Sequence, residues 1–206
     1  QIERVLPDGY AYGCASGYPD NCIAFREEHF ELTAPDGVSA ACNGIDCSTY
    51  VVSNPADCSV DGRIALLEGK SEDVPFILAV VHANAGVDPE DAACRHSQLK
   101  SIESVLLDKP SDTPIIIAGD FNLDPDIYAT EDVDAFNEML ESLQLTWLPV
   151  DDNTHLISQF KLDHVMVRGL SSLREADCSA RYLDENEDNV LFDHAFVLCD
   201  NHYPSG

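Results

Sequence analysis

Apolar and polar positions divide the chain into short strand-like runs, followed by longer strands that alternate with helices. Apolar or alternating runs separated by Gly, Pro and Asp predict strands over residues 22–26, 30–34, 48–53, 62–69 and 75–83. The last run, PFILAVVHA, is the most apolar of these and contains His82. This order indicates that several strands precede the first helix.

The spacing changes to a helical one between Asp88 and Leu107. An Asp-Pro pair and early acidic residues mark the start of a helix, and apolar residues then recur on one face. A second helix is predicted over 133–145, and later strands over 115–117, 162–168 and 194–199. Because no internal repeat or change of composition divides the chain, we expect one α/β domain over residues 1–206.

The composition fits a single domain with one or two sheets. The 206 residues are 45% hydrophobic and 24% charged, which is enough apolar material for a sizeable core. No run approaches the ~18 apolar residues of a membrane span, and no charged-then-apolar leader opens the sequence. We therefore expect a chain with no membrane span.

The charge is strongly acidic. Eleven Lys and Arg stand against 38 Asp and Glu, a formal net charge of −27, and the acidic residues are spread along the chain. Such a surface repels polyanions, so contact with nucleic acid or an anionic membrane would need salt, a local basic patch or bridging cations. A solvated acidic surface is common in secreted or high-salt proteins, so acidity alone names no function.

The eight cysteines favour disulfides over a zinc site. None forms a CxxC pair, and no His lies at zinc-finger spacing from two of them. The pattern points to an oxidising compartment, and we expect a secreted, extracellular protein. Cys178 with Cys199 and Cys42 with Cys47 are plausible bridges, because the first pair flanks the C-terminal strands and the second closes a local loop.

Polar side chains that could take part in catalysis or metal binding stand beside several apolar strands. TPIIIAGDFNLDPD, residues 113–126, ends its strand with Asp120 and Asn122. The others are His82, Asp163, Asp193 and His194. One such residue is usually a cap or a satisfied core group, whereas the whole set predicts convergence in one cleft. Carboxylates for a divalent cation, an acid/base pair and donors to phosphate oxygens are what phosphoester hydrolysis needs.

Three motifs, IIIAGDFN, KLDHVMV and FDHAFV, follow VVHANAG in the order that resembles the endonuclease/exonuclease/phosphatase superfamily, which includes deoxyribonuclease I. The resemblance covers about residues 20–200. It implies an α/β four-layer sandwich, in which two mixed β-sheets pack face to face between helices. It also implies a hydrolase that uses Mg²⁺, or Ca²⁺ or Mn²⁺, on a phosphoester substrate, with DNA as the leading one.

The resemblance assigns roles to the residues near GDFN. Asp120 would orient or deprotonate the attacking water, and Asn122 would hold a phosphate oxygen. His82 would help to bind or protonate the phosphate.

Its remaining assignments concern the second histidine and the metal. Asp163 would hold His194 as the acid/base partner, and Asp193 would bind the metal. Members of the family begin with a strand carrying a metal-site Asn and a later strand ending in Gln-Glu, whereas this chain opens QIERVLPDGY. We therefore expect that the family's first strand is lacking. Glu3 is the candidate metal ligand from a shifted position; the alternatives are an absent N-terminal portion or an incomplete metal site.

Several other features of the sequence allow more than one interpretation. His155 lies in the loop before KLDH and could touch substrate, whereas His29, His96 and His202 lie in polar surroundings and are interpreted as surface residues. The LDPD segment after GDFN is interpreted as a turn rather than as a Ca²⁺-binding rim. For the whole protein, the alternative to an enzyme is a non-catalytic relative that uses the fold for binding or extracellular assembly.

Overall fold

The computed structural model describes residues 7–15, 18–32, 43–45, 50–51, 58, 64–71, 73–128, 130–170, 177–181 and 194–200. Its largest sheet has seven strands in the order β3-β6-β7-β8-β10-β9, with β5 also paired to β6. These strands are β3 Glu31–Leu32, β5 Tyr50–Val51, β6 Ile64–Ser71, β7 Val74–His82, β8 Ile115–Asp120, β9 Thr146–Leu148 and β10 Asp163–Arg168. The β7 and β8 strands are parallel, and β10 runs antiparallel to β8, so this sheet is mixed.

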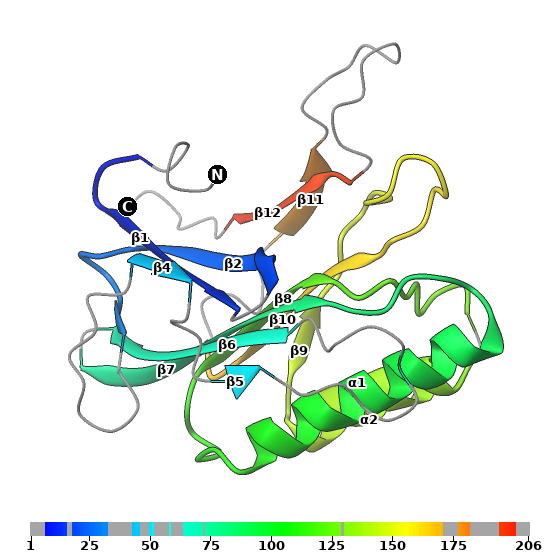
Figure 1. The fold of residues 1–206 in the computed structure, drawn as a ribbon, viewed down its shortest axis with the longest axis horizontal. Coiled ribbons are helices and arrows are strands. Elements are labelled where there is room, and N and C mark those ends of the chain that lie inside the picture. The colour runs from blue at the N-terminus through cyan, green and yellow to red at the C-terminus, as the bar shows by residue number, and fades with distance from the viewer. Residues whose placement is uncertain are drawn as a thin grey trace.

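Two helices cover one face of the large sheet, as Figure 1 shows. They are α1 Pro89–Leu107 and α2 Glu131–Ser142. Alternate strand residues such as Ile77 and Ile117 share one buried cluster with Ile102 of α1 and Phe136 of α2, because successive side chains on a strand point to opposite faces. The α1 helix is the crossover that returns the chain from β7 to β8, the connection that a parallel pair requires.

A second β layer packs against the other face of the large sheet. It contains β1 Tyr10–Ala15, β2 Tyr18–Arg26 and β4 Asn43–Ile45 in the order β2-β1-β4, together with the pair β11 Asp177–Arg181 and β12 Phe196–Asp200. Phe76 and Leu78 of β7 pack against the cluster that contains Phe25 of β2, whereas Val165 of β10 and Val197 of β12 pack against a second cluster. The predicted α/β sandwich is confirmed; within the described ranges, its helices lie outside the large sheet.

The predicted elements differ from the observed ones mainly at their ends. The strand expected over 115–117 continues to Asp120, and the second helix begins at Glu131 and ends at Ser142 rather than covering 133–145. Strands β1, β4, β9 and β11 were not predicted, because they are short or contain Gly, Ser or Asp. The single domain over residues 1–206 that lacks the family's first strand stays a prediction.

Disulfides join elements in both halves of the described chain. The predicted bridge between Cys178 and Cys199 is confirmed and crosses from β11 to β12, with Cα atoms 4.1 Å apart. A second bridge joins Cys58 to Cys94 of α1, and Cys22 is also disulfide-bonded. The proposed pair of Cys42 and Cys47 lies outside the described residues. None of the helices in the described part of the chain has the length and apolar character needed to span a membrane.

Candidate active site

Three adjacent strands place His82, Asp120 and Asp163 in one row. His82 of β7 is the register partner of Asp120 at the end of β8, and Asp120 is in turn the partner of Asp163 at the start of β10. Each shares a strand face with a residue that packs toward the second β layer, namely Leu78 on β7, Ile116 on β8 and Val165 on β10. The row therefore lies on the inner face of the sandwich, at the carboxyl ends of the parallel strands.

Gly119 lets β7 and β8 approach closely beside this row. Its φ is +140°, and a Cβ there would lie 2.0 Å from the carbonyl oxygen of Val81. Any side chain would therefore push β8 away from β7 or change its path. This steric constraint explains why a glycine precedes Asp120 in GDFN.

Asp120 lies between two imidazoles. Its Oδ2 atom is 3.6 Å from Nε2 of His194 and 3.9 Å from Nε2 of His82. Both distances exceed a direct hydrogen bond, so a water or a substrate oxygen can lie between the partners. The second ring nitrogen of His194, Nδ1, lies 2.7 Å from Oδ2 of Asp163. Four of the predicted residues are thus brought together, and His194 is aligned by a carboxylate as expected.

Asn122 fixes the orientation of Asp120. Its backbone N–H donates to Oδ1 of Asp120 at 2.8 Å, and its side-chain amide donates to Oδ2 at 3.1 Å and to the carbonyl of Ala83 at 3.0 Å. The backbone of Asn122 has a φ of 49°, a conformation that Asn tolerates better than most residues. Asn122 therefore acts on the carboxylate in this structure, and its expected contact with a phosphate oxygen stays a prediction.

Burial and a neighbouring carboxylate raise the pKa of Asp120 to about 6. Burial is the larger cause, and the charge of Asp163 adds to it; the backbone N–H of Asn122 and the histidines 194 and 155 oppose the shift. A carboxylate with a pKa near the working pH can accept a proton and release it again. Perturbed carboxylates of this kind are typical of functional sites.

Thr154 joins the two chain segments that carry Asp163 and His194, although sequence reasoning missed it. Its side chain is fully buried. Its hydroxyl oxygen accepts from the backbone N–H groups of Leu162 and Asp163 at 2.8 and 3.0 Å, and its carbonyl accepts from Ala195 at 2.7 Å. A threonine in a polar loop carries no sequence signal for such a role, because no local pattern identifies which backbone groups, such as that of the distant Ala195, it will meet.

Two further histidines near the site have different surroundings. The ring of His155 lies 4.8 Å from that of His194 between centroids, and Ser158 contacts its Nδ1. Its predicted place beside the site is therefore correct, while contact with substrate stays a prediction. His164 instead points into the core, where Nε2 lies 2.8 Å from the carbonyl oxygen of Leu123 and burial lowers its pKa. It takes an aromatic core position.

The LDPD segment forms the expected turn. Asp124 is buried, and its carboxylate accepts from the backbone N–H groups of Asp126 at 3.1 Å and Lys161 at 2.9 Å. These bonds tie the loop after β8 to the residues before β10.

Asp120, Asp163 and His194 form a group that could supply some of the ligands of one cation. Their ligand atoms lie within 4.8 Å of one another. Two carboxylates supply the oxygen ligands that Mg²⁺ and Ca²⁺ prefer, so the donor set fits part of a divalent-metal site. The two predicted metal ligands, Glu3 and Asp193, lie outside the described residues, and their roles remain predictions.

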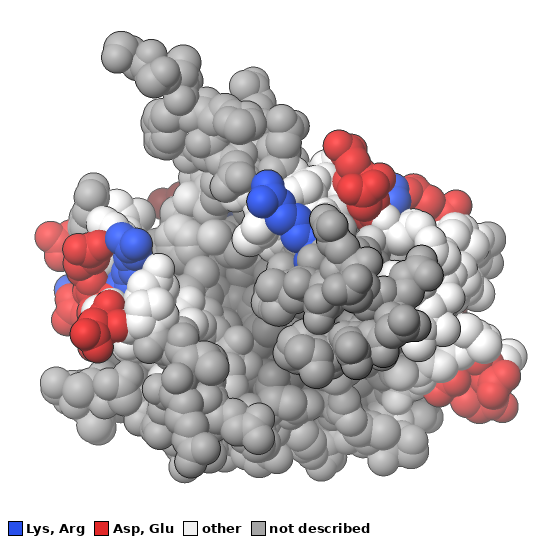
Figure 2. Space-filling model, turned by 90° about the horizontal axis from the view of Figure 1, so that it is seen from above, with Lys and Arg blue, Asp and Glu red and all other residues white. Residues whose placement is uncertain are grey.

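Acidic side chains dominate the charged groups that Figure 2 displays on the described surface. They gather at the edges of this face, and Lys and Arg appear in separate small groups. This view gives no sign of a continuous basic stripe on the described residues. Because the formal net charge is −27, a polyanionic substrate would be repelled unless salt screens the charges or cations bridge them.

The fold and this cluster of carboxylates and imidazoles fit a class of enzymes that hydrolyse phosphoester bonds. The model of the Endonuclease/Exonuclease/phosphatase family matches residues 28–183. The chain belongs to this family, whose members are typically metal-dependent hydrolases of phosphoester bonds. The predicted family resemblance is thus confirmed.

Solved structures show the same fold at low sequence identity. The human Nocturnin catalytic domain with bound sulfate is 15% identical, with a TM-score of 0.61 over 96% of this chain and 73% of that chain. TDP2 of D. rerio, complexed with single-strand DNA product, is 12% identical, with a TM-score of 0.61 over 93% and 76%. A family protein from Bacteroides thetaiotaomicron is 16% identical, with a TM-score of 0.60 over 98% and 78%. No curated protein sequence matches the chain.

Proposed function

We propose that this protein is a secreted, divalent-metal-dependent phosphodiesterase with DNA as its leading substrate. The observation that carries the proposal is the position of Asp120 between two imidazoles, one of which is aligned by Asp163. This geometry supplies a base and an acid around one small volume, which general acid–base catalysis requires. The disulfides support an extracellular setting.

In this proposal, Asp120 orients the attacking water and takes its proton. The water oxygen forms a bond to phosphorus, and the bond from phosphorus to the leaving oxygen breaks. Asp163 accepts a hydrogen bond from Nδ1–H of His194, and His194 enters the step as the imidazolium, so that its Nε2–H gives the proton to the leaving oxygen and the ring becomes neutral. His82, on the other side of Asp120, donates to a phosphate oxygen.

A bound Mg²⁺, or Ca²⁺ or Mn²⁺, would neutralise negative charge that develops on the phosphoryl oxygens. Asp120 and Asp163 offer carboxylate oxygens for it, and Glu3 and Asp193 are the further ligands that the sequence suggests. Such cations would also lower the repulsion between a phosphate and a chain with a net charge of −27.

DNA leads the substrate list because the family includes nucleases and because a similarly folded protein, TDP2, is solved with a DNA product. At 12% identity that likeness supports the fold alone, so the substrate must be tested. RNA, lipid and sugar phosphoesters are the competing classes.

The test is hydrolysis of a panel of DNA, RNA, lipid and sugar phosphoesters with Mg²⁺ and with a chelator. We expect cleavage that the chelator abolishes and Mg²⁺ restores. Asp120→Asn should lower the rate about 10²–10⁴-fold, which also shows that no contaminating enzyme is responsible. Asp126→Asn is the matched control, because its carboxylate lies in the same loop but outside the row. A folded, metal-supplied wild type that cleaves nothing would favour the non-catalytic alternative.

A further inference from the structure

The loop of residues 83–86 lies in the connection from β7 to α1 and is hydrogen-bonded to the candidate active site. It follows His82 directly. The N–H of Ala83 donates to the carbonyl of Asp120 at 2.8 Å, and the carbonyl of Ala83 accepts from the side chain of Asn122 at 3.0 Å. A displacement of this loop would therefore move His82 and the amide that orients Asp120.

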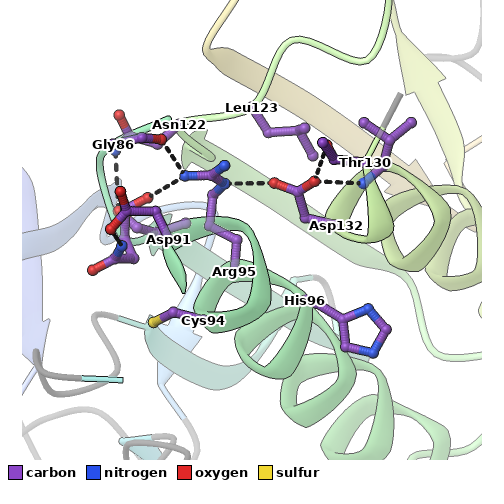
Figure 3. A network of polar contacts seen from close by, with 12 residues as sticks. Gly86, Asp91, Cys94, Arg95, His96, Asn122, Leu123, Thr130 and Asp132 are labelled. Atoms are coloured by element: carbon purple, nitrogen blue, oxygen red, sulfur yellow. Dashed lines mark hydrogen bonds and ion pairs between the residues drawn. The ribbon is translucent and has the colours of Figure 1, made fainter. Parts of the chain in front are cut away.

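Three side chains of α1 hold this loop from below, as Figure 3 shows for Asp91 and Arg95. Asp91, Arg95 and Gln98 recur at helical spacing and so share a face. Oδ1 of Asp91 accepts from Nδ2 of Asn84 at 2.9 Å, and Oε1 of Gln98 accepts from the N–H of Asn84 at 2.9 Å. Nη1 of Arg95 donates to the carbonyls of Asn84 at 3.1 Å and Gly86 at 2.7 Å.

Arg95 is itself oriented by Asp132 of α2. Its Nε donates to Oδ2 of Asp132 at 2.7 Å, and the two residues are 3% and 0% exposed. Thr130, the N-cap of α2, also bonds to the Asp132 carboxylate. One buried ion pair therefore links the loop, α1 and the start of α2.

Gly86 adapts the loop to this arrangement. It has a φ of +115°, and a Cβ there would lie 2.0 Å from Oδ2 of Asp91. The Asp91 side chain is held in place, since its Oδ2 also accepts from the N–H of Asp88. A side chain at position 86 would therefore displace Asp91 and disturb its contacts with the loop.

We propose that Arg95, oriented by Asp132, is a positioning residue for the candidate active site. It fixes the two carbonyls of the loop so that His82 and Asn122 stay aligned with Asp120. A buried ion pair contributes little net stability compared with apolar side chains, so its use here is better explained by the geometry that it imposes. The kinetic part of this inference rests on the proposed function.

A matched control is available in Arg168 of β10. It is also buried, at 8% exposure, and also donates to backbone carbonyls, those of Thr113, Leu143 and Pro110. It lies at the end of β10 opposite to Asp163, paired with the first residue of β8. Loss of its fork should disturb the fold without reaching the site.

The kinetic experiment compares Arg95→Lys with Arg168→Lys in the full chain. Lysine keeps the charge but cannot reproduce the fork of an arginine. We expect similar falls in melting temperature. Arg95→Lys should lower kcat about 10²-fold with KM changed much less, because misplaced catalytic groups affect the transition state most. Arg168→Lys should leave kcat within about two-fold, a change of no more than ~0.4 kcal/mol in the barrier. Equal kcat in the two variants would overturn the inference.

An NMR measurement separates this inference from the proposed function. In the substrate-free, chelator-treated protein, the side-chain amide signals of Asn122 and the imidazole signals of His82 should shift in Arg95→Lys and stay unchanged in Arg168→Lys. If the wild type hydrolyses nothing but these shifts occur, the positioning role stands and the proposed function fails.

A second variant covers the case in which Arg95→Lys does not fold. Asp132→Asn keeps the shape of the Asp132 side chain but removes the charge that orients Arg95. It should therefore give the same NMR shifts of Asn122 and His82 at smaller amplitude. Unchanged Asn122 and His82 signals in a folded Asp132→Asn or Arg95→Lys protein would overturn the inference whatever the activity.

Discussion

The two ends of the large sheet both bury charged side chains, but they treat the charge in opposite ways. At the end of β8, the Asp120 carboxylate is buried beside a second carboxylate, Asp163, and faces two imidazoles across gaps too long for direct hydrogen bonds. At the other end, the Arg168 guanidinium is surrounded by backbone carbonyls that accept its hydrogens. One end places two like charges close together, and the other end pairs its charge with hydrogen-bond acceptors.

This difference separates a site for chemistry from a structural anchor. Burial lowers the pKa of Arg168, with Asp112 opposing the shift, yet an arginine remains charged throughout the working range of pH. Burial and a like charge instead bring the pKa of Asp120 to about 6, where it can change its protonation state. Natural proteins retain such locally unfavourable groups where function requires them.

The largest expected effect concerns the Asp163–His194 pair. His194→Ala and Asp163→Asn should each lower hydrolysis about 10²–10⁴-fold, because the first removes the imidazole and the second no longer fixes its tautomer. If the two residues act as one unit, the double variant should be little slower than either single variant. Rates of the four proteins on one substrate test this. Fully multiplicative losses would show that Asp163 and His194 act independently.

The residues of this pair and of the row were predicted because each stands beside an apolar run, whereas the pairing of Asp163 with His194 was implied by the family resemblance. His82, Asp120 and Asp163 end or begin strands, and a shared sheet edge makes such positions converge. His194 was found from its motif, although it lies just before β12 rather than in it.

The supporting residues could not be predicted from one sequence. Arg95 lies in a helix whose outer positions are also charged, and Thr154 lies in a polar loop. Their roles depend on distant partners: Asp132 is 37 positions from Arg95, and Ala195 is 41 positions from Thr154. Local patterns report which face of an element is buried, and they do not report which distant carbonyl a buried donor will meet.

The second prediction concerns the stability cost of Asp120. Its pKa is 3.8 in an exposed carboxyl and about 6 here. Between these values the folded protein binds more protons than the unfolded chain, so the free energy of unfolding falls as pH rises through the window. The full effect is at most about 3 kcal/mol above pH ~6. Asp120→Asn should remove this pH dependence. Its altered hydrogen bond with Asn122 should separately lower the free energy of unfolding by about 1 kcal/mol, which offsets part of the gain.

Thermal or urea unfolding with a chelator present, from pH ~4 to ~7, measures this difference. Relative to wild type, Asp120→Asn should become more stable as the pH increases, although it is the less active protein. The Asp126→Asn variant, which changes an exposed carboxyl outside the row, is the control measured alongside it. A constant difference between Asp120→Asn and wild type across this range would contradict the assigned environment of Asp120.

The smallest expected effect belongs to His96, the neighbour of Arg95 on α1. Its Nδ1 lies 3.0 Å from the carbonyl oxygen of Glu131, so it too links α1 to the first residue of α2, but from a more exposed position. His96→Ala should lower the free energy of unfolding by about 1 kcal/mol or less and leave kcat within about two-fold. Unfolding and initial-rate measurements on this variant therefore separate two explanations of the expected fall in kcat of Arg95→Lys. If His96→Ala lowered kcat as strongly as Arg95→Lys, any weakening of the contact between α1 and α2 would disturb the site. An unchanged kcat would show that the carbonyls of the 83–86 loop, which only Arg95 of these two neighbours contacts, carry the effect.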